Sequence, residues 1–274
     1  MSSRRRGGPG ARPVRGRVIL VAALLAASGP AVVPEDVAWE TRAASIASEL
    51  LGALIDLDEQ VRFVLHAGRK AGVEPFAGHR INRVLDPYSL ALHQEGRGRR
   101  DPLARLMREA TLAAASHEAQ VERTIQALDA TERAWLRERQ RLVDAITRLR
   151  ALALQLEADK APNRARARLV ARRTVAQIDN TLARIGLLGQ RVVGIVRQAE
   201  LSWSRVREPA QRAMPAENEV RAPTERFAEA MIGEILAIEY ELRAASEAVR
   251  TGAYRLQREA TRIRRMLAPL LEAS

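Results

Sequence analysis

The chain has 274 residues, a formal net charge of +12 and no cysteine. That length allows one or two ordinary domains, and the lack of cysteine excludes disulfides, thiolate catalysis and cysteine-based zinc sites. Hydrophobic residues make up 47% of the chain but aromatic residues only 3%, so any core must be mainly aliphatic. Ala, Leu, Arg and Glu dominate and form helices readily. The composition therefore favours an all-α protein over sandwiches and barrels, which rely on aromatic and β-branched residues.

The N-terminal segment has the layout of a secretory signal peptide. Six arginines and no acid precede an apolar run from Val18 to Ala27, and small residues follow up to Ala31. The run is short for a membrane span of ~20 residues. With the weaker stretch that follows, residues 18–33 could still contact the membrane as an uncleaved anchor. We predict that residues 1–31 are a signal peptide or N-terminal anchor.

Two alternatives remain open at this end of the chain. A start at Val14 would shorten the unusually long basic region, and a disordered basic tail before a buried apolar segment would need no export. Removing residues 1–31 takes away six arginines and no acids, which lowers the net charge from +12 to +6. Half of the basic excess therefore belongs to the predicted signal and says nothing about the partners of the mature protein.

An amphipathic helix is predicted over residues 32–67. Acidic residues near its start suit the helix dipole, and apolar residues recur every three or four positions along one face. They are Trp39, Ala43, Ile46, Leu50, Leu54, Leu57, Val61 and Val64. Residues 68–100 then contain many glycines and prolines, so we expect a small irregular appendage there, packed on the main body.

The segment 101–207 is predicted to form a long helical hairpin. Asp101 and Pro102 make a helix start, and neither proline nor glycine follows until Pro162. Positions that alternate by four and three form a heptad seam, apolar except at Glu132 and Arg139. The seam is Val121, Ile125, Leu128, Glu132, Trp135, Arg139, Leu142, Ile146, Leu149, Ala153 and Leu156. Such a helix would be on the order of 80 Å long.

A second seam follows the break at Pro162 and Asn163. It consists of Val175, Ile178, Leu182, Ile185, Gly189, Val192, Val196, Ala199, Trp203 and Val206. Because the break is so short, the two long helices should lie antiparallel. Three glycines in this helix, Gly186, Gly189 and Gly194, could either allow close backbone approach or loosen the helix.

Residues 208–223 are predicted to be a linker rich in proline, glutamate and alanine, with Pro209 ending the preceding helix. A last amphipathic helix then occupies residues 224–274. Its apolar stripe is Met231, Ile235, Ile238, Leu242, Ala245, Val249, Gly252, Leu256, Ile263 and Leu267. The sequence therefore predicts an all-α fold, an elongated antiparallel bundle of long helices or coiled coil with one small irregular insert.

The densest run of positive charge lies just after Pro162. Its arginines are Arg164, Arg166, Arg168, Arg172 and Arg173, and no acid lies between Asp159 and Asp179. Such a patch could bind phosphate, anionic lipid headgroups or an acidic protein. The other interpretation is a solvated helix face, since only two of the 45 basic residues are lysine, a bias typical of GC-rich genomes. Smaller arginine clusters lie at residues 97–108 and 255–265.

No catalytic or metal-binding pattern is recognised in the sequence. His66, His79 and His93 are thirteen and fourteen residues apart, not at the four-residue spacing of a helical metal site. His117 lies between a serine and a glutamate, whose side chains diverge on a helix, so we expect it on the surface. No Walker, GxGxxG or GxSxG motif is present. The sequence therefore predicts no enzyme activity, no metal and no cofactor.

The order of the predicted elements resembles that of the minor pilus subunits of type IV secretion and conjugal-transfer systems. These elements are a signal peptide, a helix, an irregular insert and long antiparallel helices, over most of the mature chain. The resemblance implies an exported component of a secretion apparatus, but it identifies no site residue. Basic helical periplasmic chaperones share some of these features.

The sequence thus predicts a periplasmic or secreted helical scaffold that acts through protein partners in the cell envelope and could form a homo-oligomer. The alternative is a cytoplasmic, arginine-rich coiled coil that binds nucleic acid. The usual companions of nucleic-acid binding, interleaved aromatic residues and a short helix-turn-helix, are absent from the sequence. Nucleic-acid binding is not expected if the chain is exported.

Overall fold

The computed structural model describes residues 35–214 and 222–272. The predicted signal peptide and residues 215–221 of the predicted linker lie outside this range. The described residues form helices and turns only, so the predicted all-α fold is confirmed. The elements in chain order are α1 (Glu35–Gly72), a 3₁₀ helix η1 (Glu74–His79), α2 (Asn82–Gln94), α3 (Pro102–Glu157), α4 (Arg164–Arg212) and α5 (Ala222–Glu272).

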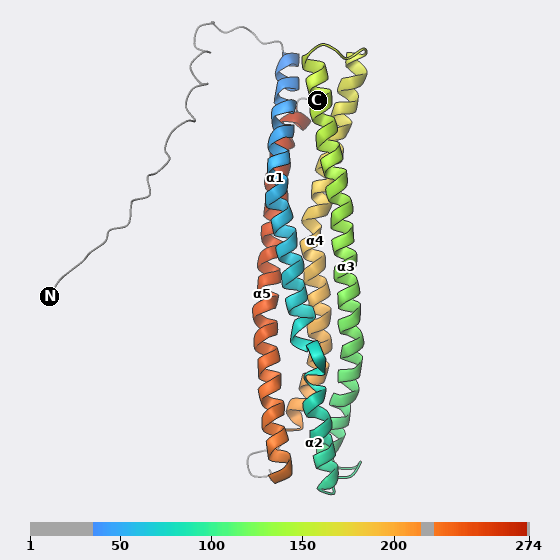
Figure 1. Cartoon of the computed structure of the whole chain (residues 1–274), viewed down its shortest axis with the longest axis vertical. Coiled ribbons are helices and arrows are strands. Elements are labelled where there is room, and N and C mark those ends of the chain that lie inside the picture. The colour runs from blue at the N-terminus through green and yellow to red at the C-terminus, as the bar shows by residue number, and fades with distance from the viewer. Residues whose placement is uncertain (1–34, 215–221, 273–274) are drawn as a thin grey trace, which may run out of the picture.

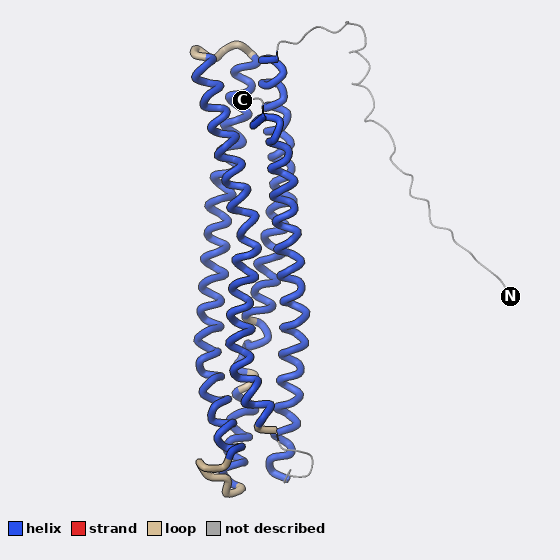
Figure 2. The backbone as a smooth tube through the Cα atoms, turned by 180° about the vertical axis from the view of Figure 1, so that it is seen from behind, coloured by secondary structure: helices blue, strands red, loops and turns tan. Residues whose placement is uncertain are grey.

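The four long helices pack side by side into an elongated antiparallel bundle (Figure 1). Helix α1 runs down between α3 and α5, and α4 completes the bundle between the same two helices on the opposite side. The longest turns lie at the two ends of the rod, and short ones also lie between them, in the half that holds η1 and α2 (Figure 2). The start of α1, the α3–α4 turn and the end of α5 share one end, while η1 and α2 lie toward the other.

Side-chain caps fix where α3 and α4 begin. Asp101 accepts hydrogen bonds from the backbone N–H groups of Leu103 at 2.8 Å and Ala104 at 3.4 Å, and Pro102 occupies the first turn. Asn163 accepts one from the N–H of Arg166 at 2.9 Å. The predicted start at Asp101 and the predicted break at Pro162 and Asn163 are both confirmed.

One apolar core runs the length of the bundle. Every predicted seam residue of the first helix is buried, from Trp39 to Val64, and so is the whole α4 seam from Val175 to Val206. The α3 seam is buried at its apolar positions from Leu128 onward, whereas Ile125 is 40% exposed. Burial of apolar faces, rather than helix propensity alone, stabilises helices of this kind.

The two charged positions of the α3 seam pair with α1. Glu132 accepts a hydrogen bond from Arg69 at 2.9 Å, and Arg139 donates to Asp58 at 2.8 Å. The hydrogen bonds of Arg69 to Glu132 and Asp129 raise the pKa of Arg69. The charges thus occupy the α1–α3 boundary instead of interrupting the core.

Helix α1 extends past the predicted end near residue 67, because its glycines allow close packing. A Cβ atom at Gly68 would lie 2.7 Å from Cγ1 of Val192, and one at Gly72 would lie 2.6 Å from Cγ2 of Thr124. The glycines therefore bring α1 close to α3 and α4 without breaking the helix.

The predicted appendage at 68–100 is mostly helical, since η1 and α2 occupy much of it. Tyr88 of α2 is fully buried and donates a hydrogen bond to the carbonyl of Ala213 at 3.0 Å. Burial raises the pKa of Tyr88 to about 12. The prediction that Pro209 ends α4 is wrong. The helix continues to Arg212, with Pro209 and Ala210 buried.

Candidate functional site

The arginines of the predicted anion-binding patch at the start of α4 fall into two groups: some pair with a buried acid of α1, and the others are exposed. Arg168 donates to Oε1 of Glu40 from Nε at 3.0 Å and Nη2 at 2.9 Å, and Arg164 lies 3.6 Å from the same oxygen. Glu40 is 0% exposed. A buried carboxylate is stable only when it is paired, so Arg168 and Arg164 serve the α1–α4 contact.

The other three arginines of the patch, Arg166, Arg172 and Arg173, are exposed. Arg164 also contacts Asp159 at 3.0 Å. The residues that the sequence grouped as one basic patch therefore point in different directions, and part of their charge is balanced within the bundle. The binding of an anionic partner there stays a prediction.

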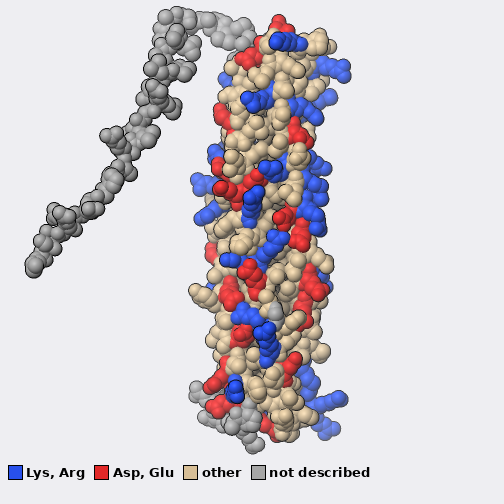
Figure 3. Space-filling view, in the orientation of Figure 1, with Lys and Arg blue, Asp and Glu red and all other residues tan. Residues whose placement is uncertain are grey.

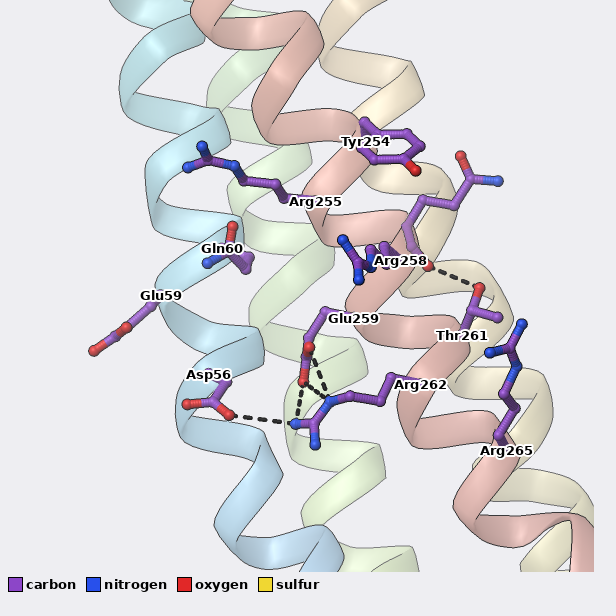
Figure 4. Close-up of a pocket in the computed structure, with 11 residues that line it drawn as sticks. Asp56, Glu59, Gln60, Tyr254, Arg255, Arg258, Glu259, Thr261, Arg262 and Arg265 are labelled. Carbon is purple, nitrogen blue, oxygen red and sulfur yellow. Dashed lines mark hydrogen bonds and ion pairs between the residues drawn. The ribbon is translucent and has the colours of Figure 1, made fainter.

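A second arginine cluster lines an open groove between α1 and α5 with a volume of about 860 Å³. Figure 4 shows Arg262 between Asp56 of α1 and Glu259 of its own helix. Its hydrogen bonds to Glu259 raise the pKa of Arg262. Four arginines and three acids line this groove, so its charges nearly cancel and it is a weak candidate for an anion site.

Two further arginines of these clusters also contact groups within the fold. Arg264 of α5 points to α4, where it donates to Asp179 at 2.7 Å, and this hydrogen bond raises the pKa of Arg264. In the arginine cluster at residues 97–108, Arg108 donates to the carbonyl of Arg99 at 2.7 Å. Acidic and basic side chains are intermingled over the visible face of the molecule (Figure 3).

A different site, which the sequence did not indicate, lies where η1 packs against α3. It is a cavity of about 260 Å³. Apolar side chains form most of its wall, with Phe76 and Ile81 on one side, Ala114 and Val121 on α3, and Ile238 of α5. His117 is the one described residue with a polar side chain in this cavity that is also almost fully buried, at 3% exposure.

The predicted surface position of His117 is wrong. Neither ring nitrogen has a hydrogen-bond partner among the described residues. Burial lowers the pKa of His117 to about 4, with nearby Glu118 opposing this shift. The ring is therefore uncharged at neutral pH, with one N–H donor and one acceptor nitrogen.

Two aromatic rings hold the imidazole of His117 in place. Phe76 meets it edge-on, with ring centroids 4.3 Å apart, and Trp203 of α4 lies at 5.9 Å. The sequence did contain a signal for this burial. Ala110, His117, Thr124 and Thr131 follow one another at seven-residue spacing on α3, and all four are buried. They form a second inward row beside the predicted heptad seam.

Hydrogen bonds and ion pairs fix the mouth of the cavity. Nδ1 of His79 lies 2.8 Å from Oε1 of Glu118, and Asn82 donates to the same oxygen. Arg80 donates to Glu241 at 3.0 Å, pairs with Glu234 and donates to the carbonyl of Pro75 at 3.3 Å. His79 has a left-handed backbone with φ of 54°, a conformation that needs support from its surroundings.

The described residues contain no group of three or more His, Asp or Glu side chains that could hold a metal ion. In the same residues, no helix has a stretch long and apolar enough to cross a membrane.

Comparison with known proteins gave no match, since no protein family, curated protein or solved structure is significantly similar to the chain.

Proposed function

We propose that this protein is a non-catalytic helical scaffold that acts through protein partners in the bacterial envelope. The observation that carries the proposal is the way its arginines are used. Ion pairs link neighbouring helices at several heights of the rod: Arg69 with Asp129 and Glu132, Arg80 with Glu234 and Glu241, Arg139 with Asp58, Arg207 with Glu239, and Arg264 with Asp179.

Each exposed pair contributes little to stability, but pairs between helices favour one register over others. Much of the positive charge is thereby balanced by acids of the bundle itself. A nucleic-acid-binding protein would instead be expected to gather unbalanced cations on one face. The charge pattern therefore supports a rigid rod that presents a mixed, polar surface to proteins.

Export is the second part of the proposal, and it rests on the predicted signal peptide at residues 1–31. The element order that resembles minor pilus subunits also supports a place in a secretion apparatus. Helix α1 begins at the end of the rod opposite η1. An N-terminal anchor, if retained, would therefore present η1 and α2 on the order of 60 Å from the point of attachment.

Cell fractionation with intact-mass analysis tests this proposal. The full chain would be expressed in a bacterial host with a C-terminal tag. We expect a soluble periplasmic species that lacks residues 1–31, or a full-length species in the inner membrane. A matched variant with Leu24→Arg and Leu25→Arg should stay full length in the cytoplasm, because charges disrupt the apolar part of a signal. A full-length cytoplasmic wild-type protein would refute export.

Nucleic-acid binding remains the second candidate, because Arg166 and Arg173 are exposed in a stretch of α4 without acids. Titration of residues 32–274 with duplex DNA at several salt concentrations tests it. Binding that weakens steeply as salt rises, and less steeply in Arg166→Ala with Arg173→Ala, would support this candidate. Binding that does not depend on these arginines would count against it.

A further inference from the structure

We propose that the cavity between η1, α3 and α5 binds a small, uncharged and largely apolar molecule that carries one hydroxyl or N–H group. Such a ligand has the size and chemistry of a phenol. This site goes beyond the scaffold function and does not depend on where the protein is located.

The size and lining of the cavity set the class of ligand. Its volume is about 260 Å³, and an apolar cavity of ~150 Å³ in another protein is known to bind benzene. The cavity can therefore hold a single substituted ring. Its walls are provided by Phe76, Ile81, Ala114, Val121 and Ile238, which favour an apolar body.

The polar group of the ligand is set by His117. This side chain lines the cavity, is 3% exposed, and has no hydrogen-bond partner on either nitrogen among the described residues. Buried polar groups in proteins nearly always have a hydrogen-bond partner. A ligand hydroxyl beside His117 would supply the hydrogen bond that the buried imidazole lacks. A buried, uncharged imidazole gives no charge to bind a carboxylate or phosphate, so the ligand should be neutral.

Arg80, the cation at the cavity mouth, does not favour an anionic ligand, because acids of the protein already pair with it. Arg80 is held by Glu234 and Glu241, and His79 faces Glu118 at 2.8 Å. These contacts keep Arg80 paired with acids and hold η1 against α3 and α5. The site is therefore organised before a ligand arrives, which lowers the entropic cost of binding.

Calorimetric titration of the full chain with phenol and with toluene tests the proposal. The two molecules have nearly the same shape, but only phenol has a hydroxyl. We expect sub-millimolar binding of phenol to the wild type. In His117→Leu, the ratio of the toluene Kd to the phenol Kd should fall about tenfold, the equivalent of roughly one hydrogen bond, while toluene still binds.

Two further variants control for location and folding. Val121→Trp should fill the cavity and abolish the binding of both molecules, whereas His66→Leu makes the same chemical change as His117→Leu at an exposed position of α1 and should leave both affinities unchanged. Circular dichroism would establish that each variant is folded. The proposal is overturned if phenol does not bind the wild type at about 10 mM, or if the ratio is unchanged in folded His117→Leu.

Discussion

His117 is a buried polar residue for which the bundle itself provides no partner. Four of the other buried polar residues on the long helices, Thr124, Thr131, Thr174 and Thr181, donate to the carbonyl four residues earlier on their own helix. Neither ring nitrogen of His117 makes such a bond, so both lack a partner among the described residues. The same residue is therefore both the candidate ligand contact and a source of instability.

Stability should fall on acidification because of His117. In the unfolded chain this residue has a pKa near 6.5, whereas burial lowers the pKa in the folded protein to about 4. Below pH 6.5 the unfolded state binds a proton that the folded state excludes, so the free energy of unfolding falls as pH drops from 6.5 towards 4. From pH 7 to pH 5 the loss should be about 2 kcal/mol.

Urea unfolding of the wild type and His117→Leu at both pH values measures this effect. Carboxylates contribute equally to both proteins, so the difference between them isolates the histidine. An equal loss of stability in the two proteins would show that His117 is not buried in its neutral form.

Two glycines of α4 should respond in opposite directions to the same substitution. A Cβ at Gly189 would lie 2.8 Å from the Cα of Ala253 on α5, whereas one at Gly194 would meet nothing within 4 Å. Gly189→Ala should destabilise the protein by about 1–2 kcal/mol because the backbones must separate. Gly194→Ala should stabilise it by about 0.5–1 kcal/mol through helix propensity. Thermal and urea unfolding would measure both, and a stabilising Gly189→Ala would contradict the close approach of α4 and α5.

The contact between helices α1 and α4 includes a buried ion pair. Helix α4 lies diagonally across the bundle from α1, so few residues span the gap. Glu40 and Arg168 do so near one end of the rod. A pair of this kind contributes little net stability, but losing Arg168 would leave the buried Glu40 with only the longer contact to Arg164, at 3.6 Å.

Arg168→Met should therefore reduce the free energy of unfolding by about 2–3 kcal/mol. Arg173→Met provides a matched control, because this exposed residue lies on the same helix, and its effect should stay within about 0.5 kcal/mol. Adding Glu40→Leu to Arg168→Met should restore much of the loss, since no charge is then left buried. If the double variant were no more stable than the single one, the pairing of Glu40 with Arg168 would not be what the site requires.

At the scale of the whole molecule, the continuous core predicts cooperative unfolding. Trp39 lies in the first turns of α1 at one end of the rod, and Trp203 lies in the second half of α4, towards the other. Both are buried in the same hydrophobic cluster. Two variants in which Trp135 and one of these tryptophans are replaced by Phe should each show fluorescence that changes at the same urea concentration as the helical signal. Different midpoints would mean that the two ends of the bundle unfold independently.

The sequence by itself determined the helical class, the long helices and most of the core, because an apolar face at three- and four-residue spacing can be buried only against other helices. The caps at Asp101 and Asn163 are local, so they could also be predicted. The continuation of α4 through Pro209 and the cavity beside His117 could not, since both depend on neighbours far away in the sequence.

The tertiary structure alone decided which charges remain at the surface. Sequence proximity grouped Arg164, Arg166, Arg168, Arg172 and Arg173 into one patch, but the fold turns Arg168 towards Glu40, 128 residues away. It also brings Phe76, His117 and Trp203 from three separate elements into one cluster of rings. A linear pattern records which residues share a helix face; only the packing of several helices determines which of those faces meet.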